Sequence, residues 1–232
     1  MVKLWRFGSP SGAEFFLNML AFSLLVLNFH SYGVAVAAAV TITFNWDMVS
    51  FIPLIGVGIG VTSLVGRYMG AGQPDTAHRA TMSGLKIAAL YTAVTFTAFC
   101  LFPEPLVAIF RPDEADAAFA EVVPLAVFMV RLIAVYVFAD AMVNVFGSAL
   151  RGAGDTFWTM VLSVSGHWVL TLSAMAMIHV VKAGPRAVWM MVVVLVIGLG
   201  SAFSLRYRSG RWRTLRVVEP PTPMHQDAEL HL

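Results

Sequence analysis

Between Gly12 and Leu205 the chain consists almost entirely of long apolar stretches, interrupted at five places by short turns rich in Gly, Pro, Asp and Arg. Hydrophobic residues make up 59% of the sequence and charged residues only 12%, whereas a soluble globular domain carries roughly a quarter charged residues. A soluble core of this size could not bury so much apolar surface. The pattern therefore predicts a membrane protein.

A bilayer-spanning helix needs about 20 mostly apolar residues, and six such segments fit into the sequence. The expected spans are residues 12–29, 34–65, 81–101, 119–150, 157–181 and 186–205. A membrane β-barrel would need segments that alternate apolar and polar side chains, which these do not. The expected fold class is all-α, a polytopic membrane protein with six transmembrane helices. Residues 1–11 form the N-terminal segment, residues 12–205 the membrane unit and residues 206–232 a basic, proline-containing tail.

The distribution of Lys and Arg predicts the orientation. With the N-terminus inside, ten basic residues lie on the cytoplasmic side and three outside. The inside set is Lys3, Arg6, Arg67, Arg79, Arg151, Arg206, Arg208, Arg211, Arg213 and Arg216, and the outside set is Arg111, Lys182 and Arg186. We expect a multi-pass protein of the plasma (inner) membrane with both termini in the cytoplasm. The basic tail is expected to contact anionic headgroups rather than nucleic acid.

The second expected span is longer than a bilayer requires, so it must tilt, bend or project from the membrane. It contains Pro53, which removes a backbone donor, followed by Gly56, Gly58 and Gly60. Glycine allows a neighbouring helix to approach closely and also lowers the cost of bending. The sequence predicts close helix packing or a hinge here. It excludes a phosphate-binding loop, because no Gly-Lys-Ser/Thr follows.

Two turns expected on the cytoplasmic side share a pattern. Residues 70–72 read Gly-Ala-Gly and precede Asp75, and residues 152–154 repeat this before Asp155. Glycine after a helix supplies a left-handed C-terminal cap, and the Asp or the Thr that follows it, Thr76 or Thr156, can accept hydrogen bonds from the first amides of the next helix. Each turn is expected to end one span and begin the next in this way.

Polar residues at membrane depth are the candidate functional residues, since a carboxylate there costs about 2.5–3.5 kcal/mol on insertion scales. Tyr136, Asp140 and Asn144 are spaced by four residues and form one polar stripe on the fourth span. Such a stripe can hold a proton or a cation, and a purely structural acid is the alternative. Arg131 lies on the opposite side of the helix and should not pair with Asp140.

Asp47 is the second deep carboxylate, and it lies close to Asn45 on the second span. Thr43, Asp47 and Ser50 fall on one side of this helix. This arrangement predicts either a cavity wall or a buried helix-to-helix hydrogen bond.

Several stretches resemble the MATE family of multidrug and toxin extrusion transporters. They are residues 51–60 (FIPLIGVGIG), 64–72 (LVGRYMGAG) and 147–156 (GSALRGAGDT), and residues 7–16 (FGSPSGAEFF) resemble the start of the family's seventh helix. The resemblance covers most of the chain, in order. It implies one six-helix lobe, helices seven to twelve of a transporter whose two lobes rock about a central cavity and export organic cations in exchange for Na⁺ or H⁺.

The resemblance also places Asp140 at the family's acidic position on the tenth helix, which is associated there with cation or proton coupling. The first span departs from the family pattern, because many relatives carry an acid where this chain has Asn18. Glu14, one turn earlier on the same face, is the candidate substitute. Without it, Na⁺ binding at Asp140 loses one negative charge, and coupling to H⁺ is left. No cofactor is expected, and no transition-metal site, since no second His or Cys lies at ligand spacing.

The expected function is secondary active efflux of organic cations and drugs by antiport with H⁺ or Na⁺. An enzyme is not expected, since no nucleophile–base pair appears. A flippase for lipid-linked sugars is one alternative, although only Lys86 and Arg131 are available to bind a pyrophosphate. A non-transporting or split lobe that packs with a partner is another. Because alternating access needs two moving halves, we expect a second lobe, from another copy or a separate N-terminal half.

Overall fold

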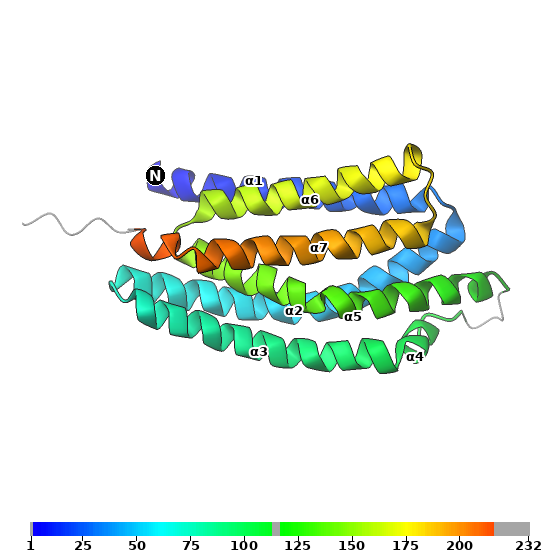
Figure 1. Ribbon diagram of the computed structural model, residues 1–232, viewed down its shortest axis with the longest axis horizontal. Helices are drawn as coiled ribbons and strands as arrows, with labels where there is room; N and C mark the ends of the chain where they lie inside the picture. The colour runs from blue at the N-terminus through cyan, green and yellow to red at the C-terminus, as the bar shows by residue number, and fades with distance from the viewer. Residues whose placement is uncertain (1, 113–116, 216–232) are drawn as a thin grey trace, which may run out of the picture.

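The chain folds into a bundle of long helices, shown in Figure 1 for a computed structural model that describes residues 2–112 and 117–215. The elements in chain order are α1 (Val2–His30), α2 (Val34–Gly70), α3 (Pro74–Leu101), α4 (Pro103–Ala108), α5 (Ala117–Gly152), α6 (Thr156–His179), α7 (Pro185–Arg208) and the 3₁₀ helix η1 (Arg211–Thr214). All of these except α4 and η1 are long and apolar enough to cross a membrane. The expected all-α fold with six spans is therefore confirmed.

The first and last long helices, α1 and α7, extend beyond the expected spans. α1 begins at Val2, so residues 2–11 are helical, while its membrane-capable part is Gly12–His30 and begins where the first span is expected. α7 continues to Arg208, and η1 follows within the expected tail. Arg216 and the rest of the tail lie outside the described residues. Short α4 lies within residues 102–118, the loop expected between the third and fourth spans.

The antiparallel course of the six long helices places the connections at two opposite ends (Figure 1). The start of α1, the α2–α3 turn, the α5–α6 turn and η1 lie at one end, which we call the N-terminal end. The α1–α2 turn, α4 and the α6–α7 turn lie at the opposite end. The first and last described residues are thus on the same side, as six spans require.

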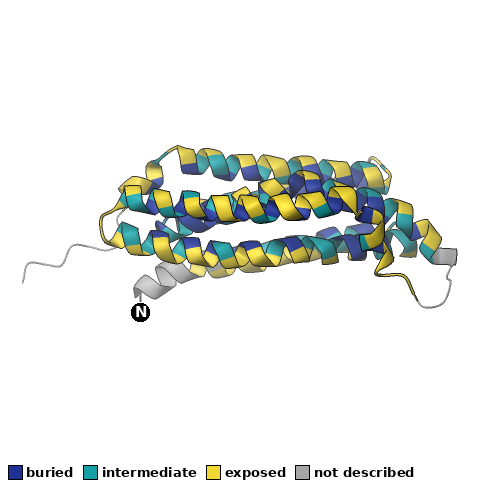
Figure 2. Cartoon of the chain, turned by 90° about the horizontal axis from the view of Figure 1, so that it is seen from below, coloured by how far each residue is buried: buried dark blue, intermediate teal, exposed yellow. Residues whose placement is uncertain are grey.

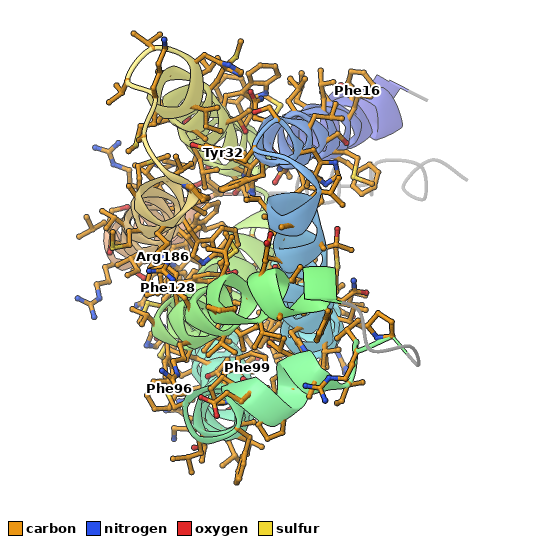
Figure 3. All side chains as sticks on the ribbon, turned by 90° about the vertical axis from the view of Figure 1, so that its right-hand side faces the viewer. Phe16, Tyr32, Phe96, Phe99, Phe128 and Arg186 are labelled. Atoms are coloured by element: carbon orange, nitrogen blue, oxygen red, sulfur yellow. The ribbon has the colours of Figure 1, made fainter. Side chains whose placement is uncertain are left out.

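α5 is the central helix of the bundle. More than half of its membrane window, 56%, is buried, against 22–33% for the other five spans. It packs against α2, α3 and α7, whereas α1 packs mainly against α6. The end-on view in Figure 3 shows α1 and α6 together on one side and α3 at the opposite edge. In Figure 2 the buried positions face the helix–helix contacts and the exposed ones cover the outside.

Two apolar clusters follow one another along α5. The cluster toward the end opposite the N-terminal end joins Phe29 of α1, Met129 of α5 and Trp189 of α7. The cluster toward the N-terminal end joins Leu54 of α2 and Phe203 of α7 to α5. Among the side chains that the structure describes, none from α1 belongs to this second cluster.

One close helix contact depends on Gly152, the last residue of α5. A methyl group added at Gly152 would lie only 2.6 Å from the backbone oxygen of Thr62 on α2. Because that neighbour is backbone, it cannot turn aside as a long side chain could. The absence of a side chain at Gly152 therefore sets the distance between α2 and α5 at this end.

The two Gly-Ala-Gly turns confirm one half of the capping prediction. Gly72 and Gly154 have positive φ angles of 69° and 88°, the left-handed conformation expected after a helix. The other half is wrong, because the side chains of Asp75 and Asp155 cap neither following helix. Each carboxylate instead pairs with an arginine of the C-terminal segment.

The stronger of these two ion pairs joins Asp155 to Arg206 at the end of α7. The Oδ2 atom of Asp155 accepts a hydrogen bond of 2.9 Å from Nε of Arg206, and Nη2 lies 2.8 Å from the same oxygen. Arg213 of η1 binds Asp75 through a single longer contact of 3.2 Å. A charged guanidinium is a stronger partner for a carboxylate than a backbone amide, which explains why the expected caps do not form. The end of α7 thereby binds the α5–α6 turn, and η1 binds the start of α3 next to the α2–α3 turn.

Candidate functional site

The central feature of the membrane interior is an acidic cluster formed by Asp47 of α2 with Tyr136 and Asp140 of α5. The Tyr136 hydroxyl donates a hydrogen bond of 2.8 Å to Oδ1 of Asp47. Asp140 lies one turn further along α5, and its carboxyl group interacts electrostatically with that of Asp47. Of the two roles expected for Asp47, the structure therefore shows the helix-to-helix hydrogen bond.

The cluster lies deep in the bundle. Asp140 is about 18 Å before the end of α5 at Gly152, at about 1.5 Å per residue. Tyr136 is buried with 4% of its surface exposed, and both acids are half-buried. Among the residues that the structure describes, no Lys, Arg or His forms an ion pair with either carboxylate. The negative charge at this position is therefore not neutralised by a permanent cation of the described chain.

Asn144 continues the polar face of α5 toward the N-terminal end. Its Nδ2 atom donates to the backbone oxygen of Asp140 at 3.1 Å. Tyr136, Asp140 and Asn144 thus share one face, as their spacing of four predicts. The oxygen donors gathered here are two carboxyl groups and a phenol, a chemistry that suits a proton or a hard cation rather than a soft metal.

A tryptophan next to Asp47 fixes the rotation of α2. The indole Nε1 of Trp46 donates to the backbone oxygen of Leu106 in α4 at 3.0 Å. The rings of Phe99 and Phe110 pack edge-on against it, each at 6.3 Å between centroids. Because Trp46 is anchored on this side, Asp47 is turned toward α5.

Pro53 leaves one backbone acceptor of α2 without its helical donor, because proline has no N–H to bond the carbonyl four residues earlier. That carbonyl belongs to Val49, and the Tyr91 hydroxyl of α3 donates to it at 2.7 Å. In a membrane an unsatisfied carbonyl is costly, so a side chain from a neighbouring helix takes over the missing bond. The backbone hydrogen bond that is missing at Pro53 lies within two turns of Asp47, and Tyr91 of α3 replaces it.

Only one of the three glycines after Pro53 contacts a neighbouring helix. A Cβ atom at Gly58 would lie 2.6 Å from Oγ of Ser148 on α5. At Gly56 and Gly60 it would have no atom within 4 Å. Close packing is thus the arrangement at Gly58, and the hinge role of the segment stays a prediction.

Asn18 and Glu14 of α1 do not reach the acidic cluster. Oε1 of Glu14 accepts a hydrogen bond of 2.9 Å from Nη1 of Arg151, and Glu14 is only 8% exposed. Nδ2 of Asn18 donates to Oγ of Ser163 on α6 at 2.7 Å, and its buried Oδ1 has no partner in the described chain. Arg151 compensates the charge of Glu14 in this arrangement, so a coupling role for Glu14 or Asn18 stays a prediction.

The polar neighbours of Asp47 on α2 bond to their own helix. Nδ2 of exposed Asn45 donates to the backbone oxygen of Thr41 at 2.8 Å. The hydroxyl of Thr43 donates to the backbone of its own helix at 2.7 Å, and that of Ser50 does so at 3.4 Å. Asp47 is therefore the member of this group that connects two helices.

The two basic residues available to a flippase lie on the outside of the described bundle. Lys86 is exposed on α3. Arg131 is exposed on α5 and pairs with Glu104 of α4 at 3.4 Å. This confirms that Arg131 does not pair with Asp140.

Trp46 and Tyr91 are supporting residues that the sequence did not single out. For Tyr91 a signal existed, because a proline inside a span predicts an orphaned carbonyl that needs a hydroxyl donor from a neighbour. Which neighbouring helix supplies the donor depends on the packing and cannot be read from one sequence.

The chain matches the family model described as MatE over residues 10–177. It is 27% identical over 221 residues to "Probable multidrug resistance protein NorM" of Thermotoga maritima, covering 93% of this chain and 46% of that protein. It is 28% identical over 228 residues to multidrug resistance protein PmpM of Pseudomonas aeruginosa, covering 96% and 46%. The chain thus spans about half the length of the curated relatives it matches.

Solved structures show the same fold. A MATE crystal structure in the bent conformation matches with a TM-score of 0.79 at 18% identity, covering 89% of this chain and 45% of that one. A MOP superfamily transporter from Pyrococcus furiosus matches with a TM-score of 0.74 at 20% identity, covering 96% and 48%. The six-helix bundle corresponds in each case to about half of the solved chain.

Proposed function

Because the chain belongs to the MatE family, whose members are integral membrane transporters and not enzymes, we propose that it forms one lobe of an antiporter. This antiporter exports organic cations and drugs in exchange for H⁺ or Na⁺. The observation that carries the proposal is the acidic cluster, with two carboxyl groups at membrane depth and no described basic partner. An acid kept inside a membrane protein at such cost marks an ion or substrate pathway.

The ion and the organic cation compete for the same negative charge, and this competition couples the transport of one to that of the other. Two carboxyl groups that share a site of low dielectric constant can hold one proton or one small cation between them. When that ion leaves, the cluster attracts an organic cation, and when the ion returns, the attraction is lost and the cargo is released. Exchange follows, since the ion and the cargo favour opposite charge states of the same group.

The supporting contacts suit this mechanism. Tyr136 orients the carboxylate of Asp47 toward α5, so a change of charge at Asp140 alters the contact between α2 and α5. The break at Pro53 lies on the same helix as Asp47 and gives α2 a place to adjust. Ion binding would in this way be converted into a change of helix packing.

The transporter needs a second lobe, because alternating access requires two halves that move against each other. We propose that a second copy of this chain or a separate N-terminal half supplies it. We propose that both termini are cytoplasmic, which the Lys and Arg distribution supports, and that the membrane is the plasma (inner) membrane. The mass of the transport-active particle in mild detergent should correspond to two six-helix lobes; full transport by a single six-helix lobe would contradict the assembly.

The proposal is tested by efflux of a fluorescent organic cation from energised membrane vesicles. Asp140→Asn should abolish coupled efflux while the amount of protein in the membrane stays unchanged. Tyr136→Phe should reduce efflux, because the carboxylate of Asp47 loses the donor that orients it. Asp75→Asn is the matched control, since its carboxylate lies in the first turn of α3 with 83% of the side chain exposed. Undiminished efflux by Asp140→Asn would overturn the proposal.

A further inference from the structure

A groove lies between α2 and α3 toward the N-terminal end of the bundle, away from the acidic cluster. Its volume is about 450 Å³, within the range of roughly 300–1,000 Å³ typical of small-molecule sites. Its inner part is apolar and includes Val57, Leu64 and Ile87. The groove is open at Gly60 on α2, where no side chain is present, whereas Gly84 on α3 is covered by the side chain of Val61.

The other end of the groove is polar and positively charged. Arg79 lies there with the hydroxyl groups of Tyr68, Thr76 and Ser83. Arg79 is exposed, and among the described residues it forms no ion pair. The nearby carboxylate of Asp75 is bound by η1. The groove therefore offers one guanidinium and several hydroxyl donors, the chemistry that recognises a phosphate oxygen.

The polar and apolar parts of the groove are arranged in the same order as the headgroups and acyl chains of a bilayer. Arg79 is about 8 Å beyond the start of α3 at Pro74, and Ile87 is about 12 Å further along the helix, at about 1.5 Å per residue. Because the membrane-capable helix α3 begins at Pro74, we place the charged end at headgroup level and the apolar end at the level of acyl chains. An amphiphile with an anionic head and an apolar chain matches this order.

We propose that the α2–α3 groove binds one anionic phospholipid from the surrounding leaflet. The phosphate contacts Arg79 and Ser83, and one acyl chain lies along Gly60 toward Val57 and Ile87. Charge complementarity favours an anionic over a zwitterionic headgroup, because the net charge of the bound lipid is compensated by Arg79 without a competing acid in the groove. Binding here does not depend on transport, since the groove contains none of the residues of the acidic cluster.

Native mass spectrometry of the purified chain tests the proposal, with phosphatidylglycerol and phosphatidylcholine offered in equal amounts in mixed micelles. The wild type should retain one phosphatidylglycerol at least 10-fold more often than phosphatidylcholine. Gly60→Leu should lose this retention, because Gly60 lines the groove and a Cβ atom there has no protein atom within 4 Å, so the added side chain takes the place of the lipid. Gly56→Leu is the matched control, since it adds the same side chain to an equally open position of α2 outside the groove.

The headgroup preference is tested separately. Arg79→Gln should bind both lipids equally, whereas Arg67→Gln, an exposed arginine of α2 that does not line the groove, should keep the preference. Equal retention of the two lipids by the wild type would overturn the proposal. So would unchanged phosphatidylglycerol retention by Gly60→Leu, or a lipid-free two-lobe particle in which protein covers the groove.

Discussion

Replacement of Arg206 by Gln should destabilise the bundle more than any other single change of a surface arginine that the structure describes. Arg206 donates a hydrogen bond of 2.9 Å to Asp155 and lies 2.8 Å from it in an ion pair, and the side chains are only 16% and 6% exposed. Removing one partner of such a pair leaves a buried charge without compensation, which costs about 3–5 kcal/mol. We expect the lower end, about 3 kcal/mol, because the pair lies at the end of the bundle.

The chain contains a matched control in the neighbouring ion pair. Arg213 binds Asp75 through one contact of 3.2 Å, with 41% and 83% of the side chains exposed, and such a pair contributes about 0–1 kcal/mol. SDS titration in mixed micelles, followed by circular dichroism, should therefore separate Arg206→Gln from Arg213→Gln by about 2 kcal/mol or more. Adding Asp155→Asn to Arg206→Gln should recover part of the loss, since no buried charge is then left alone. Equal effects of the two single substitutions would refute this reasoning.

Three further changes test the packing, the proline break and the orientation. Gly152→Leu should cost about 1–3 kcal/mol or more in the same titration, because its Cβ would lie 2.6 Å from the backbone oxygen of Thr62; wild-type stability would show that α2 and α5 separate freely. Tyr91→Phe should cost about 1–3 kcal/mol, since it leaves the carbonyl of Val49 unsatisfied, and a neutral effect would mean that water or lipid reaches this carbonyl. Arg111→Cys, in a background without the native cysteine, should react with a membrane-impermeant maleimide in intact cells, whereas reaction only after permeabilisation would reverse the proposed orientation.

The six spans could be predicted because the bilayer fixes the length of an apolar helix. The helices differ from the expected spans only where that constraint stops: α1 continues back to Val2 beyond its membrane-capable part, Gly12–His30, and α4 forms between two spans. Beyond the apolar core, helix ends depend on local contacts, which composition does not specify.

The turns show how tertiary contacts override a local pattern. The glycine half of the motif was predictable, because the left-handed conformation at Gly72 and Gly154 is a local property. The role of Asp155 was not, since its partner Arg206 lies on another helix and competes with the nearby amides. A local capping rule assumes that no stronger donor is available.

The acidic cluster was predictable in part. The spacing of Tyr136, Asp140 and Asn144 defines one face of a helix, and the structure keeps them on one face. The contact between Tyr136 and Asp47 depends on the rotation of α2, which the Trp46 anchor to α4 fixes. Such a rotation arises from packing between helices and leaves no periodic signal in the sequence.

The most direct test of the account is the ion movement that accompanies transport at the acidic cluster. Proteoliposomes containing the two-lobe particle should take up H⁺ or Na⁺ when an organic cation moves outward, measured with a pH-sensitive dye and a Na⁺ electrode. We predict cargo-dependent ion counterflow for the wild type and none for Asp140→Asn. Counterflow of wild-type size in Asp140→Asn would contradict the central claim that this carboxyl group exchanges the ion for the cargo.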